Sequence, residues 1–395
     1  MIKKLLFYNS SSFHNAYKHM FANIPDGFEG TLGEHMDNNL IPISKDTPSN
    51  ISKIVTKIST SIKPSISQLY NKFHIILNKP KRRKFFSLDF DLIHSCQNLL
   101  DTNIPYVVDF EHPAVFSGYN QYALDNPRFM RTLTKLLLDK KLKKLLSWTL
   151  ASKNHLVSLA KNKDVESKIE VIYPIFTPPA ILTKNKHEPV TFLFIGKVFF
   201  EKGGYDVLLA FDKISKKYDT RLIMVTPVPE QIRAQFSKNS KITFLGPQPY
   251  EKIKQLYVES DVFVFPTHLD TYGFVIPEAF SYGLPVISVD SFSTSELVTH
   301  MKTGLIVKSF YSCFRPDGGY AYPTLEQLNS KRLEATKHPT ERYIDELSQS
   351  MSLLIENESL RTSLSKNARK EATEGKLSPS RWKKQMKKIY EEASE

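Results

Sequence analysis

Short apolar runs that alternate with helical patterns constrain the fold of this chain more than any other feature. Strands of a parallel sheet covered on both faces are short and continuously apolar, and the segments between them follow the period of a helix. Six such runs stand in the second half of the chain, at 191–195, 220–225, 242–245, 262–265, 285–289 and 305–307. Helical patterns at 205–217, 251–259 and 277–282 separate several of them. The alternation predicts a doubly wound α/β domain.

A first series of the same kind precedes this one. Its strand candidates lie at 4–8, 92–94, 106–109, 144–148 and 169–173. Between about 38 and 84 the sequence is polar and rich in Ser and Lys, and we interpret this stretch as an insertion whose structure the pattern does not specify. The two series therefore predict two α/β domains, each with its own parallel sheet.

Proline and polar residues mark the expected division between the two domains. Pro178-Pro179 and the polar stretch 184–189 have the composition of a linker, so we expect domains at 1–180 and 181–377. The remaining segment, 378–395, begins with Ser378-Pro379, a favourable cap and first-turn pair for a terminal helix.

Composition limits the class of protein. The chain is 41% apolar and has no run near the 18 apolar residues of a membrane-spanning helix, so we expect a cytoplasmic protein. Its two cysteines, Cys96 and Cys313, lack the spacing of a disulfide framework or a zinc site.

The net charge of +13, most of it in the first half, predicts an anionic partner. The densest basic run holds Lys79, Lys81, Arg82, Arg83 and Lys84. On an anionic membrane each basic residue contributes about 1 kcal/mol, which would make the protein peripheral to the membrane. A solvated loop is the alternative. Nucleic acid is not favoured, because no nucleic-acid-binding module accompanies the run.

A loop with glycine and lysine follows the first strand of the second domain. Gly196 and Lys197 come directly after the apolar run, and Lys202 precedes Gly203-Gly204 before the next helix. Open α/β sheets bind phosphates at this position. Gly196 permits close backbone approach, and the two lysines supply positive charge for a diphosphate. A surface turn with solvated lysines is the alternative.

Two carboxylates stand eight positions apart after the strand at 262–265. Asp270 precedes Gly273, which frees the backbone so that the amides of Phe274 and Val275 can face an anion at the start of a helix. Glu278 lies in the first turn, where a carboxylate can accept hydrogen bonds from ribose hydroxyls. Taken alone, Glu278 could equally interact with the helix dipole.

The stretch from Asp270 to Ile287 resembles glycosyltransferase family 4, whose E-x7-E motif is followed by Ala, a small-residue turn and Gly-x-Pro-Val. Gly196-Lys197 with Lys202-Gly203 is similar to that family's Gly-Arg…Lys-Gly donor loop. Other matching segments, at 260–262, 296–298 and 303–305, stand in the family's order, and the resemblance spans about residues 190 to 310.

The resemblance implies a GT-B fold, in which two Rossmann-like domains face each other across a cleft and the last helix crosses back to the first domain. It also implies retention of configuration, and no metal or other cofactor. By resemblance Lys197 and Lys202 contact the diphosphate of the donor and Asp270 the sugar hydroxyls. Glu278 contacts the ribose, while Gly196, Gly273, Phe274 and Val275 line the donor site.

Two residues of the second domain depart from the family pattern. Asp270 stands where the family usually has Glu, and Lys197 stands where it usually has Arg, so donor preference and geometry can differ.

In the first domain, His112 follows the strand at 106–108 in the manner of a functional family histidine that hydrogen-bonds the transferred sugar. A structural histidine at a strand end is the alternative.

These observations predict a retaining glycosyltransferase that moves a hexose-type sugar from a UDP- or GDP-sugar to a glycan, lipid-linked or other hydroxyl acceptor. A GT-B sugar-nucleotide epimerase, a glycogen-type phosphorylase and a non-catalytic nucleotide-sugar-binding protein on the same fold are the alternatives. Phosphorylases are far longer and need a Schiff-base lysine.

Overall fold

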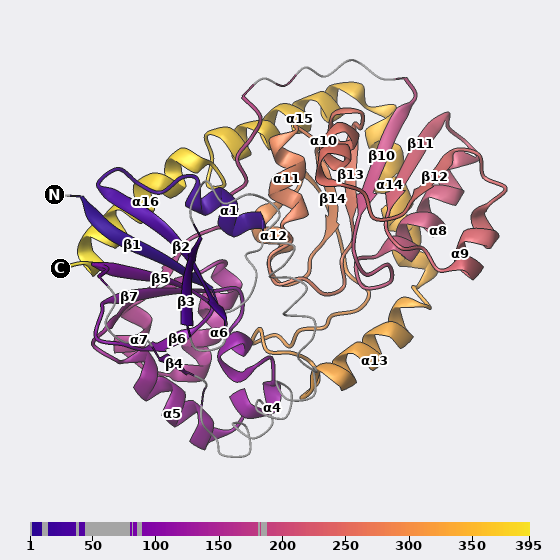
Figure 1. Cartoon of the computed structure of the whole chain (residues 1–395). Helices are drawn as coiled ribbons and strands as arrows, with labels where there is room; N and C mark the ends of the chain where they lie inside the picture. Colours follow the sequence, from indigo (N-terminus) through magenta and orange to yellow (C-terminus); the bar gives the residue numbers. More distant parts are fainter. Residues whose placement is uncertain are drawn as a thin grey trace. The chain divides into compact units, whose positions relative to one another are not determined.

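The computed structural model describes residues 2–9, 15–36, 39–43, 80, 82–84, 89–180, 182 and 188–395. The chain divides into two compact units (Figure 1). One contains Met1–Tyr173 together with Lys383–Glu395, and the other contains Pro174–Trp382. Most of the predicted insertion at 38–84, including Lys79 and Lys81, lies outside the described residues.

A seven-stranded sheet with the order β3-β2-β1-β5-β7-β8-β9 forms the first unit. All of its neighbouring strands are parallel except β2 and β3. Strands β5 and β7 and most of β1 are buried, as expected for continuously apolar strands in the middle of a covered sheet. The strands are β1 (Lys3–Asn9), β2 (Phe28–Met36), β3 (Asn39–Ile43), β5 (Leu92–Cys96), β7 (Tyr106–Phe110), β8 (Leu142–Ser147) and β9 (Ile169–Val171).

Helices and one small strand pair complete the first unit. The short strands β4 (Arg82–Lys84) and β6 (Leu99–Asp101) pair in parallel. Asn and Thr side chains cap four of the helices, α4 to α7, by accepting backbone N–H bonds. The helices are α1 (Asn15–Phe21), the 3-10 helix η1 (Pro113–Ser117), α4 (Gln121–Leu124), α5 (Pro127–Leu137), α6 (Leu150–Ala160) and α7 (Lys163–Ser167).

The second unit contains a six-stranded, all-parallel sheet with the order β12-β11-β10-β13-β14-β15. Its strands match the six apolar runs of the sequence to within one residue. They are β10 (Val190–Ile195), β11 (Thr220–Val225), β12 (Ile242–Leu245), β13 (Val262–Phe265), β14 (Val286–Val289) and β15 (Gly304–Val307). The predicted doubly wound architecture of this domain is confirmed.

The core of the second unit lies where α8 and α14 pack on the sheet. Apolar side chains of both helices, such as Phe211 and Leu347, are fully buried against strand residues such as Phe192 and Ile287. The helices of this unit are α8 (Gly204–Ser215), α9 (Glu230–Phe236), α10 (Tyr250–Val258), α11 (Val275–Ser281), α12 (Thr294–Leu297), α13 (Leu325–Thr336), α14 (Glu341–Glu356) and α15 (Glu358–Thr373). Among the helices that the structure describes, none has the length and apolar character to cross a bilayer.

The units divide at Tyr173/Pro174 and at Trp382/Lys383, whereas the sequence placed divisions after 180 and 377. Hydrogen bonds hold the segment after Pro174 to the second unit. The Tyr272 hydroxyl donates to the Pro174 carbonyl at 2.6 Å, and Arg369 Nη2 donates to the Pro179 carbonyl at 2.6 Å. These bonds move the boundary ahead of the predicted linker.

The terminal helix α16 (Pro379–Ala393) begins in the second unit and ends in the first. In its last turns Tyr390 is fully buried, and its hydroxyl lies 2.7 Å from Nδ1 of His94. His94 Nε2 in turn lies 3.2 Å from the Asp109 carboxylate, which also accepts from the Tyr17 hydroxyl at 2.9 Å. This buried polar chain ties the end of the protein to strands β5 and β7.

Candidate donor-binding site

The topology of the second sheet identifies one edge for ligand binding. Strand β10 lies between β11 and β13, so the chain runs outward from β10 to β12 on one side and returns to the other side at β13. Loops that follow such neighbouring strands leave in opposite directions and open a crevice at the carboxyl edge of the sheet. The sequence-predicted residues Gly196 and Lys202 follow β10, and Asp270 follows β13.

Lys202 joins these two loops. Its Nζ lies 3.0 Å from Oδ2 of Asp270, 2.6 Å from the Leu269 carbonyl oxygen and 3.1 Å from Oε1 of Glu201. Burial disfavours the charged ammonium, but the charges of Asp270 and Glu201 outweigh it and raise the pKa of Lys202. Lys202 is therefore a cation at neutral pH.

Asp270 organises its own loop as well as Lys202. Its Oδ1 accepts hydrogen bonds from the backbone amides of Gly273 at 2.7 Å and Tyr272 at 3.2 Å. Gly273 has a φ of 84°, which favours glycine, so the turn into α11 depends on this residue. Phe274 is the N-cap of α11 and Val275 its first residue, where backbone N–H groups lack intrahelical acceptors.

Glu278 lies in the first turn of α11 among tyrosines. It is half-buried, and its Oε2 accepts a hydrogen bond from the Tyr257 hydroxyl at 3.1 Å. Burial raises the pKa of Glu278 to about 7, although hydrogen bonds from Tyr257 and Tyr250 oppose the shift. Because the folded protein holds this proton more tightly than the unfolded chain, Glu278 lowers the free energy of unfolding as the pH rises from about 4.5 to about 7.

Gly196 and Lys197 differ in their surroundings. A Cβ on Gly196 would lie 2.9 Å from the Cβ of Lys202, so glycine lets the Lys202 side chain pass close to the end of β10. Lys197 is exposed, and it makes no hydrogen bond or ion pair within the part of the chain that the structure describes. Its ammonium is therefore available to a ligand, whereas that of Lys202 is already engaged.

His112 belongs to the first unit, where its side chain caps a helix. It is buried, and its Nδ1 accepts the backbone N–H of Ala114 at 3.1 Å, which caps helix η1. The accepting role of Nδ1 assigns the proton of the neutral ring to Nε2. The His112 ring also lies 5.1 Å from the ring of His155. Contact of His112 with a sugar stays a prediction.

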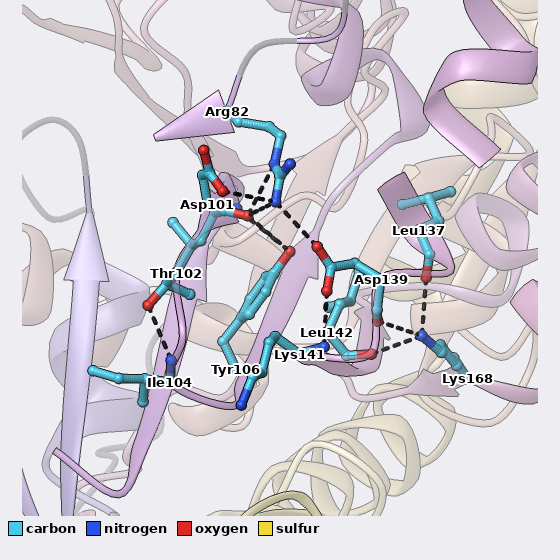
Figure 2. A network of polar contacts seen from close by, with 11 residues as sticks. Arg82, Asp101, Thr102, Ile104, Tyr106, Leu137, Asp139, Lys141, Leu142 and Lys168 are labelled. Atoms are coloured by element: carbon cyan, nitrogen blue, oxygen red, sulfur yellow. Dashed lines mark hydrogen bonds and ion pairs between the residues drawn. The ribbon is translucent and has the colours of Figure 1, made fainter. Parts of the chain in front are cut away.

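Arg82, one of the described residues of the basic run, pairs with groups of the first unit. Figure 2 shows the Arg82 guanidinium beside the carboxylates of Asp139 and Asp101. Its Nη2 lies 3.0 and 3.4 Å from these carboxylates and donates to the Leu100 carbonyl at 2.9 Å. Asp139 belongs to a turn whose carbonyl also accepts from Lys168 at 2.9 Å (Figure 2). Two carboxylates thus neutralise Arg82, and contact of this run with a membrane stays a prediction.

Three groups near the predicted site residues are not indicated by the sequence. Glu201 adjoins a predicted residue but was given no role, and Arg332 lies in α13, outside every motif. Tyr257 belongs to a helix with the expected pattern, but nothing in that pattern indicates a hydrogen bond to Glu278. Ion pairs between distant segments depend on the packing of the chain, which no local pattern reports.

Comparison with known proteins finds a family profile that matches part of the second unit. Residues 181–312 match the profile of the family described as glycosyl transferases group 1. An uncharacterized glycosyltransferase of Methanocaldococcus jannaschii is 28% identical over 120 residues, 29% of this chain and 31% of that protein. A D-inositol 3-phosphate glycosyltransferase of Nocardia farcinica is 29% identical over 109 residues, 27% and 24% of the two chains. The matched stretch thus spans about a quarter to a third of these relatives.

Solved structures resemble the whole chain at low sequence identity. A glycosyltransferase from Rickettsia africae has a TM-score of 0.62 at 15% identity, over 99% of this chain and 98% of that one. The Anabaena protein HepE, solved in complex with UDP and glucose, has a TM-score of 0.59 at 14% identity, over 98% and 99%. The predicted GT-B fold is therefore confirmed for this chain, and its residues 181–312 match the glycosyl transferases group 1 family.

Proposed function

We propose that this protein is a retaining glycosyltransferase that transfers a hexose-type sugar from a nucleoside diphosphate-sugar to a hydroxyl acceptor. The observation that carries the proposal is the charged cluster at the switch point of the second sheet. There Lys202, Asp270 and Glu201 bring a fixed ammonium and two carboxylates to the loops after β10 and β13. The profile match over the same residues supports donor chemistry at this edge.

In the proposed reaction the acceptor oxygen attacks the sugar carbon from the face that the diphosphate leaves. The new glycosidic bond forms as the bond from the sugar carbon to the diphosphate oxygen breaks, and the hydroxyl proton passes to the departing diphosphate. Negative charge grows on the diphosphate as the bond breaks, and Lys197 and Lys202 stabilise it together with the amides of Phe274 and Val275. No carboxylate is assigned as a covalent nucleophile, and no metal or other cofactor is required. Binding energy then comes from groups of the protein itself.

The Asp270 carboxylate can still accept a hydrogen bond from the sugar. A carboxylate offers about four lone-pair sites. Two backbone amides occupy Oδ1 and the Lys202 ammonium occupies one site of Oδ2, so Oδ2 can still accept a hydrogen bond from a sugar hydroxyl. In the proposed site Glu278 accepts from the ribose, which separates the roles of the two carboxylates.

A screen of UDP-, GDP- and ADP-sugars tests this function. A donor at 100 times its dissociation constant stabilises the folded protein by about 2.7 kcal/mol, which a thermal-shift assay detects. UDP-sugars are the first choice, since HepE was solved with UDP and glucose. We expect turnover of the stabilising donor to persist in EDTA. Donor binding without any turnover would favour the non-catalytic alternative. Complete loss of turnover in EDTA, with recovery in manganese, would reject the assignment of Lys197 and Lys202 as the groups that neutralise the diphosphate.

The pKa of Glu278 makes donor binding depend on pH. The ionised carboxylate accepts from both hydroxyls of a ribose, whereas the protonated form keeps only part of that capacity. We therefore expect affinity for the nucleoside diphosphate to rise as the pH passes through about 7, by up to about tenfold per unit below that pKa.

Calorimetric titrations of wild type and Glu278→Gln at a series of pH values measure this effect. The ligand titrates near the same pH, so the difference between the two proteins isolates Glu278. Glu278→Gln should bind more weakly at high pH and show the flatter profile. Parallel pH profiles for the two proteins would exclude Glu278 from the ribose site.

A further inference from the structure

Glu201 is shared between two cations. Its Oε1 lies 3.1 Å from Nζ of Lys202, and its Oε2 lies 2.7 Å from Nη2 of Arg332. The side chains of Glu201, Lys202 and Arg332 are 16%, 18% and 9% exposed, so water screens these pairs only weakly. With Asp270, the groups form a chain of alternating charge that runs from α13 to the loop before α11.

Lys202 has no spare donor in this arrangement. An ammonium group donates three hydrogen bonds, and three oxygens surround Nζ, those of Asp270, Glu201 and the Leu269 carbonyl. A diphosphate oxygen can therefore reach this ammonium only if one of the three is released. Asp270 also holds the turn into α11, and the Leu269 carbonyl belongs to the same loop, so Glu201 is the partner that can leave without disturbing that loop.

Arg332 lowers the free energy needed to separate the Glu201 carboxylate from Lys202. It comes from α13, beyond the residues that match the family profile. Its side chain is buried, and its Nη1 finds no hydrogen-bond partner among the described residues. A buried carboxylate that loses its cation is strongly destabilised, whereas Glu201 keeps Arg332 when Lys202 turns away.

We propose that Arg332 is a positioning residue that holds Glu201 and so frees Lys202 for the diphosphate of the donor. This inference rests on the proposed function. Without Arg332, Glu201 has Lys202 as its remaining cation and binds it more tightly, and the four-group cluster changes from neutral to a net negative charge. Both effects oppose an anionic ligand.

Calorimetry of the 395-residue chain with UDP, GDP and ADP tests the proposal. We expect Arg332→Met to weaken binding of the nucleoside diphosphate by about tenfold, as for coupled neighbours in one charge network. Adding Glu201→Gln to that variant should restore affinity to within about threefold, because the amide no longer holds Lys202 by charge. Lys331→Met is the matched control. It removes the neighbouring charge from the same helix, but Lys331 is exposed and pairs with Glu334, so affinity should not change.

The outcomes separate this inference from the proposed function. If the wild type binds neither UDP, GDP nor ADP, the proposed function fails and the inference fails with it. If the wild type binds and Arg332→Met binds equally well, the inference alone is overturned. If Arg332→Met and the double variant bind the nucleoside diphosphate equally weakly and both have a lowered melting temperature, Arg332 has a purely structural role. Should Arg332→Met fail to fold, Glu201→Gln alone decides, since it should bind at least as tightly as the wild type.

Discussion

Replacement of Lys202 by alanine is expected to lower the rate of sugar transfer by about a hundredfold or more, while affinity for the nucleoside diphosphate falls less. The ammonium opposes negative charge that grows as the bond to the diphosphate breaks, so its contribution is largest in the transition state. Initial rates at saturating donor, beside calorimetry with the nucleoside diphosphate, separate the two effects.

Structure adds a second consequence of this substitution. Lys202 also ties Asp270 to Glu201, so its removal leaves Asp270 with backbone amides alone. Lys202→Arg keeps the charge and should recover part of the rate. Lys216→Ala is the matched control, since Lys216 is an exposed lysine at the end of α8 that pairs with Asp212. A Lys202→Ala protein with a rate within a few-fold of wild type would remove Lys202 from the reaction.

Substitution of Gly203 by alanine should both destabilise the second unit and abolish donor binding. Gly203 is the N-cap of α8 and has a φ of 80°, a conformation that costs an L-residue about 1–2 kcal/mol. An added Cβ would also meet the carbonyl oxygen of Pro266 and lie 2.7 Å from the Pro266 ring. With the strain of overpacking, we expect a loss of about 3 kcal/mol in the free energy of unfolding.

The displaced backbone explains the expected loss of binding. Gly203 directly follows Lys202, and Pro266 directly follows β13, so a clash between them pushes apart the two loops that Lys202 joins. Gly246→Ala is the control, because a Cβ at Gly246 meets nothing within 4 Å. Denaturant unfolding and calorimetry measure the two effects. A Gly203→Ala protein as stable as the wild type would show that a Cβ fits between Gly203 and Pro266.

The second sheet was predictable from sequence because its central strands β13 and β14 are buried at every position. A strand such as Val262–Phe265 must then be apolar at every position, and it stands out as a short continuous run between polar segments. Glycine and proline at the ends of these runs sharpened the boundaries. The same reasoning found β1, β5, β7, β8 and β9 in the first unit.

Strand β2 was missed for the opposite reason. The sequence of β2, Phe28–Met36, contains two glycines, two glutamates and a histidine, so no apolar run marks it. It becomes a strand because β1 pairs with its residues 28–34 in parallel. Pairing of this kind depends on tertiary context, to which local propensity contributes little.

By itself the sequence determined the two-sheet architecture and the position of the loops after β10 and β13, and it indicated Lys202, Asp270 and Glu278 as candidate residues. Tertiary structure alone decided which charges meet. Lys202 and Asp270 stand 68 residues apart and lie 3.0 Å from each other, and Arg332 reaches Glu201 from a helix that no motif marks. The physical reason is that apolar periodicity is a property of one segment, whereas an ion pair depends on the separation of two segments, which only the packed chain defines.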